Sequence, residues 1–406
     1  MIRLIRYELI KQFCKRSILM LFVVFSLANL FKIYGEYKSY SYLTDGNGER
    51  SWHTHHWQLY EEYQGEITPE KIGRLLAVYQ PLVDATSDMT ANTATDDPGT
   101  MTGNLYSDRN LLDKYFVQPM QYSYEYSRRS EQAANRARQS AALYGERGAV
   151  YQQRECGAIY NLYADRAIPA FAYREMCNYY LNYHFSIVLT LLLCLYGIIN
   201  TFVSERETQM DMLLLVSPNG GRKTVLVKLL AATLFLILTS LWFSLLDLIG
   251  FAASFQTLEG LALPVFAIPN FAESSVNLSI FQYALLSAAF KCAGIWVIGM
   301  LWLLVSMFWK NALLPFVLGL SLCMALTVSG AACACSNFFW TKVLNPYSLL
   351  ANRVLLGKTE FINLGGFPVL TWLAAIWFAL IAGLAIAALI YFLSAENSHR
   401  CVRRAK

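Results

Sequence analysis

Long apolar segments alternate with polar ones along this chain of 406 residues. A helix that crosses the hydrocarbon core of a bilayer needs about 20 apolar residues, and six segments meet or approach that length. They are Ser17–Tyr34, His184–Val203, Leu229–Phe251, Ala284–Phe308, Ala312–Ala332 and Pro368–Leu393. The first is the weakest because Asn29 and Lys32 interrupt it. The pattern predicts an all-α, polytopic membrane protein with six transmembrane helices.

The first 16 residues contain a second pattern. In the stretch IRLIRYELIKQFCKR, Ile2, Ile5, Leu9 and Phe13 recur at helical spacing, and cations occupy the other faces. This pattern is typical of an amphipathic helix that lies in the membrane interface and leads into the first span. The alternative is an ordinary flank that serves only to set the topology.

A long polar segment, residues 35–183, separates the first two apolar segments. Within it, Thr68 is suited to cap a helix that has Pro69 at its first position. Residues 110–163 are polar, rich in Ala and Tyr, and contain Glu and Arg throughout. This composition predicts two long helices that pack against each other. We therefore expect a mainly helical domain between the first and second spans.

The distribution of charge gives these segments an orientation. Residues 35–183 hold 14 Lys and Arg against 19 Asp and Glu, whereas four short segments together hold 14 against 5. These four segments are 1–16, 204–228, 308–312 and 394–406. By the positive-inside rule, both termini lie in the cytoplasm of a multi-pass plasma-membrane protein. Residues 35–183 and the loops 252–283 and 333–367 are then extracellular.

Composition supports the membrane class and limits the cysteine chemistry. Hydrophobic residues make up 56% of the chain and charged residues 15%. The nine cysteines contain no metal-type CxxC pair. Cys156, Cys177, Cys333 and Cys335 fall on the extracellular side, where a disulfide is permitted, and the sequence leaves their pairing open.

The segment SERETQMDMLLLVSPNGGRKT, residues 204–224, ends in a glycine pair that resembles a phosphate-binding loop. That loop requires Gly-x-x-x-x-Gly-Lys-Ser/Thr, but Arg222 follows Gly221 and Val216 stands five positions before it. We therefore expect no ATP binding by this chain. The segment instead predicts a cytoplasmic helix, which the Pro-Asn-Gly-Gly turn ends. The alternative is a simple loop between spans.

The topology and this segment together resemble the ABC-2 type permeases of Gram-positive bacteria. In that family a cytoplasmic ERE…LL…P…R motif follows the second span and forms a coupling helix that docks on a separate ATPase subunit. The matching positions are Glu205, Arg206, Glu207, Leu213, Leu214, Pro218 and Arg222. Residues 208–211, Thr-Gln-Met-Asp, depart from the family pattern. Residues 65–72, GEITPEKI, and 345–350, NPYSLL, are also similar to stretches of such permeases.

The resemblance implies a permease subunit that exports a peptide, a lipid or another amphipathic compound. Its partners would be cytoplasmic ABC ATPase subunits, a second permease copy and membrane lipid, with no nucleic acid. ATP and Mg²⁺ would bind to the ATPase, and this chain would carry no cofactor and no catalytic residue. The alternative is a membrane receptor or signal-relay protein that senses a ligand through residues 35–183. Composition fits both.

Two charges lie within or near the apolar segments. An ionised side chain at the centre of a bilayer is costly, so Asp247 and Lys291 must reach the interface, line a cavity or pair with each other. All three alternatives stay open at this point.

Three histidines, His53, His55 and His56, form a further cluster in SWHTHHW. They are weak candidates for a Zn²⁺ site because no carboxylate or thiol stands beside them. A packed or interfacial segment between two tryptophans is the favoured interpretation, and a pH-dependent contact is a further alternative.

Overall fold

The structure is a computed structural model that describes residues 2–44, 49–87, 105–208, 222–334 and 339–404. Within these residues, six helices are long and apolar enough to cross a membrane, which confirms the predicted number. They are α2 (Arg16–Thr44), α9 (Phe185–Glu207), α11 (Arg222–Phe255), α12 (Ile280–Ser306), α13 (Leu313–Ala334) and α17 (Thr371–Arg404). Several extend beyond the predicted segments because polar turns continue each helix past its apolar part.

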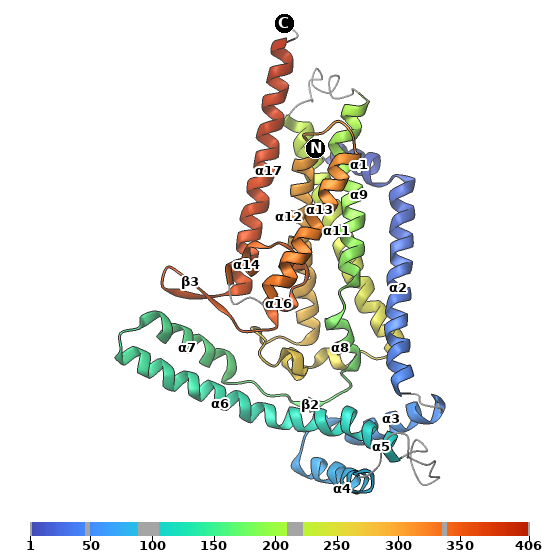
Figure 1. Ribbon diagram of the computed structural model, residues 1–406, viewed down its shortest axis with the longest axis vertical. Helices are drawn as coiled ribbons and strands as arrows, with labels where there is room; N and C mark the ends of the chain where they lie inside the picture. Colours follow the sequence, from blue (N-terminus) through green and yellow to red (C-terminus); the bar gives the residue numbers. More distant parts are fainter. Residues whose placement is uncertain (1, 45–48, 88–104, 209–221, 335–338, 405–406) are drawn as a thin grey trace.

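The six helices run side by side and form an elongated bundle (Figure 1). Helix α1 (Ile2–Phe13) and the C-terminus lie at one end of the bundle, which is also where α9 ends. The domain inserted between α2 and α9 lies at the other end, and its long helices cross the bundle axis. We call these the terminal end and the inserted-domain end.

Helix α9 is central to the bundle. In the apolar window of Glu175–Glu207, which includes α9, 78% of the residues are buried, against 17% for α2 and 11% for α13. Val23, Leu27 and Phe31 on α2 are largely exposed, as are Leu313 and Val328 on α13. Side chains of this kind favour contact with lipid tails or with another membrane protein.

The inserted domain is mainly helical. Thr68 caps its helix as expected, because its hydroxyl accepts a hydrogen bond from the Lys71 amide at 3.3 Å and Pro69 begins the helix. A two-stranded sheet pairs β1 (Gly65–Glu66) with β2 (Ala170–Phe171). The helices are α3 (Glu49–Tyr63), α4 (Pro69–Thr86), α5 (Leu105–Leu112), η1 (Asp113–Val117), α6 (Gln118–Glu146), α7 (Val150–Tyr163) and α8 (Glu175–Asn182).

The two predicted extracellular loops are folded in the structure. The first contains the short 3-10 turns η2 (Glu259–Ala262), η3 (Val265–Ala267) and η4 (Pro269–Phe271). The second contains α14 (Phe339–Leu344), α15 (Tyr347–Leu350), α16 (Arg353–Leu356) and the antiparallel hairpin of β3 (Phe361–Leu364) and β4 (Phe367–Leu370). Gly365 and Gly366 make the hairpin turn, both with positive φ. Because β4 includes Pro368, the last helix begins at Thr371 and not at the predicted position.

Two groups of buried apolar residues hold these parts together. One joins the inserted domain, α8 and the folded loops, and it includes Phe116, Met176 and Phe271. The other lies among the spans and includes Leu193 and Trp302. The first group also includes residues of the spans, so the inserted domain and the bundle share one apolar core.

Candidate functional site: two buried charge clusters

The ERE motif begins in the last turns of α9, and its first residue is buried. The Glu205 side chain is 8% exposed, and its two carboxylate oxygens receive different cations. Lys11 of α1 donates to Oε1 at 3.0 Å, and Lys228 of α11 donates to Oε2. One carboxylate therefore joins α9 to α11, which follows it in the sequence, and to the distant α1.

Two further side chains of α1 complete this group. Gln12 Nε2 donates to Glu8 Oε2 at 2.7 Å, and Lys11 Nζ lies 3.8 Å from Glu8 Oε1. We call Glu8, Lys11, Gln12, Glu205 and Lys228 the Glu205 cluster. Its two cations and two anions balance, so the group satisfies the condition under which charges are tolerated in a protein interior. Removal of one member of a buried ion pair typically costs about 3–5 kcal/mol, because the other charge remains buried.

The cluster also changes the acidity of Lys11, which lies outside the membrane-spanning segments. Partial burial by itself lowers the Lys11 pKa, because desolvation disfavours the ammonium form. The hydrogen bond that Lys11 donates to Glu205, the negative charge of Glu205 and the charge of Glu8 together exceed this effect and raise the pKa above its ordinary value. Lys11 is therefore a firmly charged link between α1 and α9.

An aromatic contact positions α1 beside the cluster. The rings of Phe13 and Phe235 stack with centroids 4.2 Å apart and planes 13° from parallel. Gly197 of α9 makes room for them, because a Cβ atom there would lie 2.7 Å from the Phe235 ring. On α1, the side chains of Glu8, Gln12 and Phe13 are buried within the protein. Residues Ile2–Phe13 form a helix, and its location in a membrane interface stays a prediction.

The other residues of the motif have different positions. Arg206 is half-buried and Glu207 is exposed. Glu207 Oε1 accepts a hydrogen bond from the Ala312 amide at 3.3 Å, which links the end of α9 to the turn before α13. Arg222 begins α11. The remaining motif residues, Leu213, Leu214 and Pro218, lie outside the described residues.

A second polar group lies toward the inserted-domain end, where side chains of α2, α9 and α12 contact Asp247 of α11. Asn29 of α2 donates to Asp247 Oδ1 at 2.7 Å, and Ser186 of α9 donates to Oδ2 at 2.5 Å. The Tyr183 hydroxyl donates to Asn29 Oδ1 at 2.8 Å. Lys291 of α12 completes the group with its Nζ 3.9 Å from Asp247 Oδ2. We call these five residues the Asp247 cluster.

Of the three alternatives that the sequence allows for Asp247 and Lys291, the structure shows that the two side chains pair with each other. Asp247 and Asn29 are 1% and 0% exposed, so this carboxylate does not reach solvent. The cavity beside Lys291 has a volume of about 20 Å³, which is enough for about one water molecule and too little for an amphipathic substrate. In this conformation the pair therefore connects helices rather than lining a large cavity.

The two clusters occur on the same two helices with equal spacing. Ser186 and Glu205 on α9 are 19 positions apart, and so are Lys228 and Asp247 on antiparallel α11. At 1.5 Å per residue this is about 28 Å, close to the thickness of a hydrocarbon core. The charges therefore stand near the two edges of the apolar part of the bundle. Between them, α9 and α11 contact each other through apolar side chains.

Only partial signals for these clusters are present in the sequence. Asn29 was recognisable as a polar interruption of the first span, but its partner was not. The charge distribution along the sequence treats Lys11 and Lys228 only as charges that set the predicted topology, although both bind Glu205. Ser186 carried no signal, because a single serine in an apolar segment is common.

The other candidate residues do not form a site in the described residues. His56 is 3% exposed and packs among aromatic rings, including Trp57 and Phe116. The side chains of His53 and His55 lie outside the described set. Where the structure describes the chain, no three His, Cys, Asp or Glu residues come together in a metal-binding arrangement.

The four cysteines predicted to be extracellular can be placed only in part. Cys156 and Cys177 are free thiols, the first half-buried and the second buried, so no disulfide joins them. Cys333 and Cys335 belong to segments whose side chains are not described. No protein-family model matches the chain, and no curated protein matches it either.

Proposed function

We propose that this chain is the transmembrane permease subunit of an ABC transporter, an exporter of a peptide, a lipid or another amphipathic compound. One observation carries the proposal: the connection between α9 and α11 starts at a glutamate that is bound to α1 and to α11. A connection anchored in this way transmits force to the spans. A simple loop between spans needs no such anchor.

The proposed mechanism begins on a partner. ATP and Mg²⁺ bind to a separate ATPase, and its closure pushes on residues 204–222 at the cytoplasmic face. Because Glu205 is bound to Lys11 and Lys228, the push moves α1, α9 and α11 together. The same two spans carry the Asp247 cluster about 28 Å away, where α2 and α12 also join. A displacement of α9 and α11 at one edge of the membrane is thereby transmitted to the other edge.

The two glutamates of the motif have different roles in this mechanism. Glu205 acts inside the permease and is a positioning residue, because its carboxylate is buried and fully used. Glu207 is exposed and, with half-buried Arg206, lies where a partner can contact it. Loss of Glu207 is therefore expected to weaken docking, whereas loss of Glu205 is expected to weaken coupling after docking.

The partners and the location follow from the same proposal. The chain lies in the plasma membrane with both termini in the cytoplasm and residues 35–183 outside. A second permease copy completes the transporter. The exposed apolar side chains of α2 and α13 provide surfaces for lipid or for this second copy.

The test is co-purification from native membranes followed by an ATPase assay. The full-length wild-type chain and the variants Glu205→Gln and Glu207→Gln are compared, with Glu131→Gln on the exposed face of α6 as a charge-matched control. We expect an ABC ATPase to co-purify with the wild type and the control. The Glu207 variant should recover less of it, and the Glu205 variant should recover it with reduced substrate-stimulated hydrolysis.

Other results would contradict the proposal. If no ATPase accompanies the wild-type chain, the transporter assignment is wrong and the receptor interpretation gains support. If an ATPase co-purifies but both variants behave as the control does, residues 204–222 are not the coupling element.

A further inference from the structure

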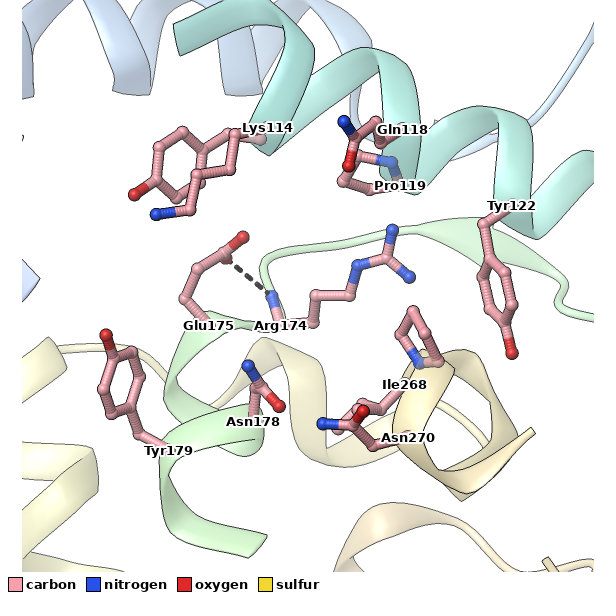
Figure 2. Close-up of a pocket in the computed structure, with 12 residues that line it drawn as sticks. Lys114, Gln118, Pro119, Tyr122, Arg174, Glu175, Asn178, Tyr179, Ile268 and Asn270 are labelled. Atoms are coloured by element: carbon pink, nitrogen blue, oxygen red, sulfur yellow. Dashed lines mark hydrogen bonds between the residues drawn. The ribbon is translucent and has the colours of Figure 1, made fainter. Parts of the chain in front are cut away.

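A cavity of about 460 Å³ lies where the inserted domain meets the folded loops. Lys114, Gln118 and Tyr122 line it from η1 and the start of α6, and Arg174 and Asn178 line it from the region of α8. The turn at residues 268–270 closes the opposite side (Figure 2). Three segments that are distant in the sequence therefore form one site. None of its lining residues belongs to the Glu205 cluster or to the Asp247 cluster.

Arg174 is the central side chain of this cavity. It is 8% exposed, and its Nη1 donates to the Ala267 carbonyl at 2.6 Å. Its Nη2 is buried without a hydrogen-bond partner among the described residues. Figure 2 shows the guanidinium extending into the space between α6 and the 268–270 turn. A guanidinium stays charged, and a buried donor without an acceptor is costly, so this nitrogen calls for an acceptor in the cavity.

The charges that face the cavity favour an anion. Arg174 and Lys114 contribute two positive charges and Glu175 one negative charge. Glu175 is already engaged, since its Oε2 accepts a hydrogen bond from the Arg174 main-chain amide at 3.2 Å (Figure 2). With Glu175 ionised, the formal charge of the lining is therefore +1, which a singly charged oxyanion balances.

The remaining lining suits an amphipathic ligand. Gln118, Asn178 and Asn270 offer amide groups that can hydrogen-bond to oxygen atoms. Pro119 and Ile268 provide apolar surface beside them. Polar groups that converge on one charge within a partly apolar wall are typical of sites that orient an organic ligand.

The surroundings place this cavity at the ends of the spans. A second cavity of about 500 Å³ shares Asn178 and Tyr179 with the first. It is lined by Lys32 and Glu36 of α2 and by Phe185, where α9 begins. A ligand that occupies both cavities would therefore extend from Arg174 to the level at which α2 and α9 enter the apolar part of the bundle. This is the depth of lipid head groups.

We propose that the Arg174 cavity binds the phosphodiester group of an anionic phospholipid. A phosphate oxygen accepts the hydrogen bond of Arg174 Nη2, and the acyl chains leave past Asn178 and Tyr179 toward α2. The phosphodiester carries one negative charge, which matches the lining. The binding is independent of any ATPase, so the inference stands apart from the proposed transport function.

The experiment uses native mass spectrometry of the full-length chain in detergent, titrated with dioleoylphosphatidylglycerol. Arg174→Gln removes the donor, and Asn270→Trp fills the exposed edge of the cavity and leaves the Arg174 hydrogen bond intact. Arg128→Gln is the charge-matched control, because Arg128 is exposed on α6 outside the cavity. We expect both cavity variants to weaken the first lipid-binding event by about tenfold or more, and the control by less than about twofold.

Each alternative outcome is decisive. If both cavity variants fold and bind the lipid as the wild type does, the proposal is overturned. If Arg174→Gln does not fold, the Asn270→Trp result decides alone. Glycerophosphoglycerol supplies the same phosphodiester without acyl chains. If it binds as tightly as the lipid and is weakened by the same variants, the site takes a soluble anion and the phospholipid assignment fails.

Discussion

Replacement of Glu205 by leucine would leave two cations of the Glu205 cluster without their main anion. Lys228 is 3% exposed, so its ammonium cannot be hydrated without local unfolding. Removal of one partner of a buried pair costs about 3–5 kcal/mol. The Lys11 contribution is smaller, because the Lys11 side chain is 39% exposed. We therefore expect Glu205→Leu to lower the free energy of unfolding by about 3–5 kcal/mol.

A second substitution separates stability from coupling. In the double variant Glu205→Leu/Lys228→Met, both buried charges are replaced by apolar side chains of similar size. Such replacements are often neutral or stabilising. We expect the double variant to recover most of the lost stability but not the link from α1 to the end of α9, because Lys11 still lacks its acceptor.

The assays are equilibrium unfolding in mixed detergent micelles and substrate-stimulated ATPase activity of the co-purified complex. The expected pattern is low stability and low activity for the single variant, and restored stability with low activity for the double variant. If the double variant regains both properties, the cluster serves only folding and the coupling role of Glu205 is wrong. If the single variant loses less than about 1 kcal/mol, the pair is not buried as described.

Three further predictions follow from other contacts. Asp247→Asn should lower the free energy of unfolding by about 1.5–3 kcal/mol, because Lys291 loses its counter-charge. The double variant Asp247→Asn/Lys291→Met should recover part of this free energy in the same unfolding assay. Because the Lys11 pKa is raised in the folded state, Lys11 contributes its full stabilisation below the ordinary pKa of 10.5 and loses it as the pH rises through the folded pKa. A Lys11→Met variant should therefore show a flatter dependence of the free energy of unfolding on pH above about pH 10. Gly197→Ala should cost about 1–3 kcal/mol because its Cβ would meet an aromatic ring of α11, whereas Gly157→Ala, with open space at its Cβ position, should be neutral or slightly stabilising.

The apolar segments could be predicted from the sequence because their signal is local. A run of about 20 apolar residues has few alternatives to a transmembrane helix, so all six helices were identified and only their ends moved. The helix cap at Thr68 was also local and was correct. The β3–β4 hairpin was missed because the stretch FINLGGFPVL is apolar on both sides of its glycine pair, so it lacks the alternation that marks a strand.

The clusters could not be predicted, because they depend on distances that the sequence does not contain. Lys11 and Glu205 are 194 positions apart, and before folding each is only a charge near a membrane edge. The same applies to Asn29 and Asp247, which are 218 positions apart. The Arg174 cavity carried no signal, since its lining comes from three separate segments that are each unremarkable alone.

The placement of polar groups on α9 and α11 has a physical reason beyond stability. Apolar contacts between helices in lipid are non-directional, so they permit sliding and rotation, whereas a buried hydrogen-bonded charge fixes one register. Two such fixed points, 19 positions apart on both antiparallel helices, make the pair behave as one rigid unit along its length. If the helices instead moved independently, a cross-link between the ends of α9 and α11 at Glu205 and Lys228 would leave the Asp247 end free. We expect that a cysteine pair introduced at these two positions and oxidised will reduce hydrogen exchange in the residues around Asp247, while unchanged exchange there would refute the rigid unit.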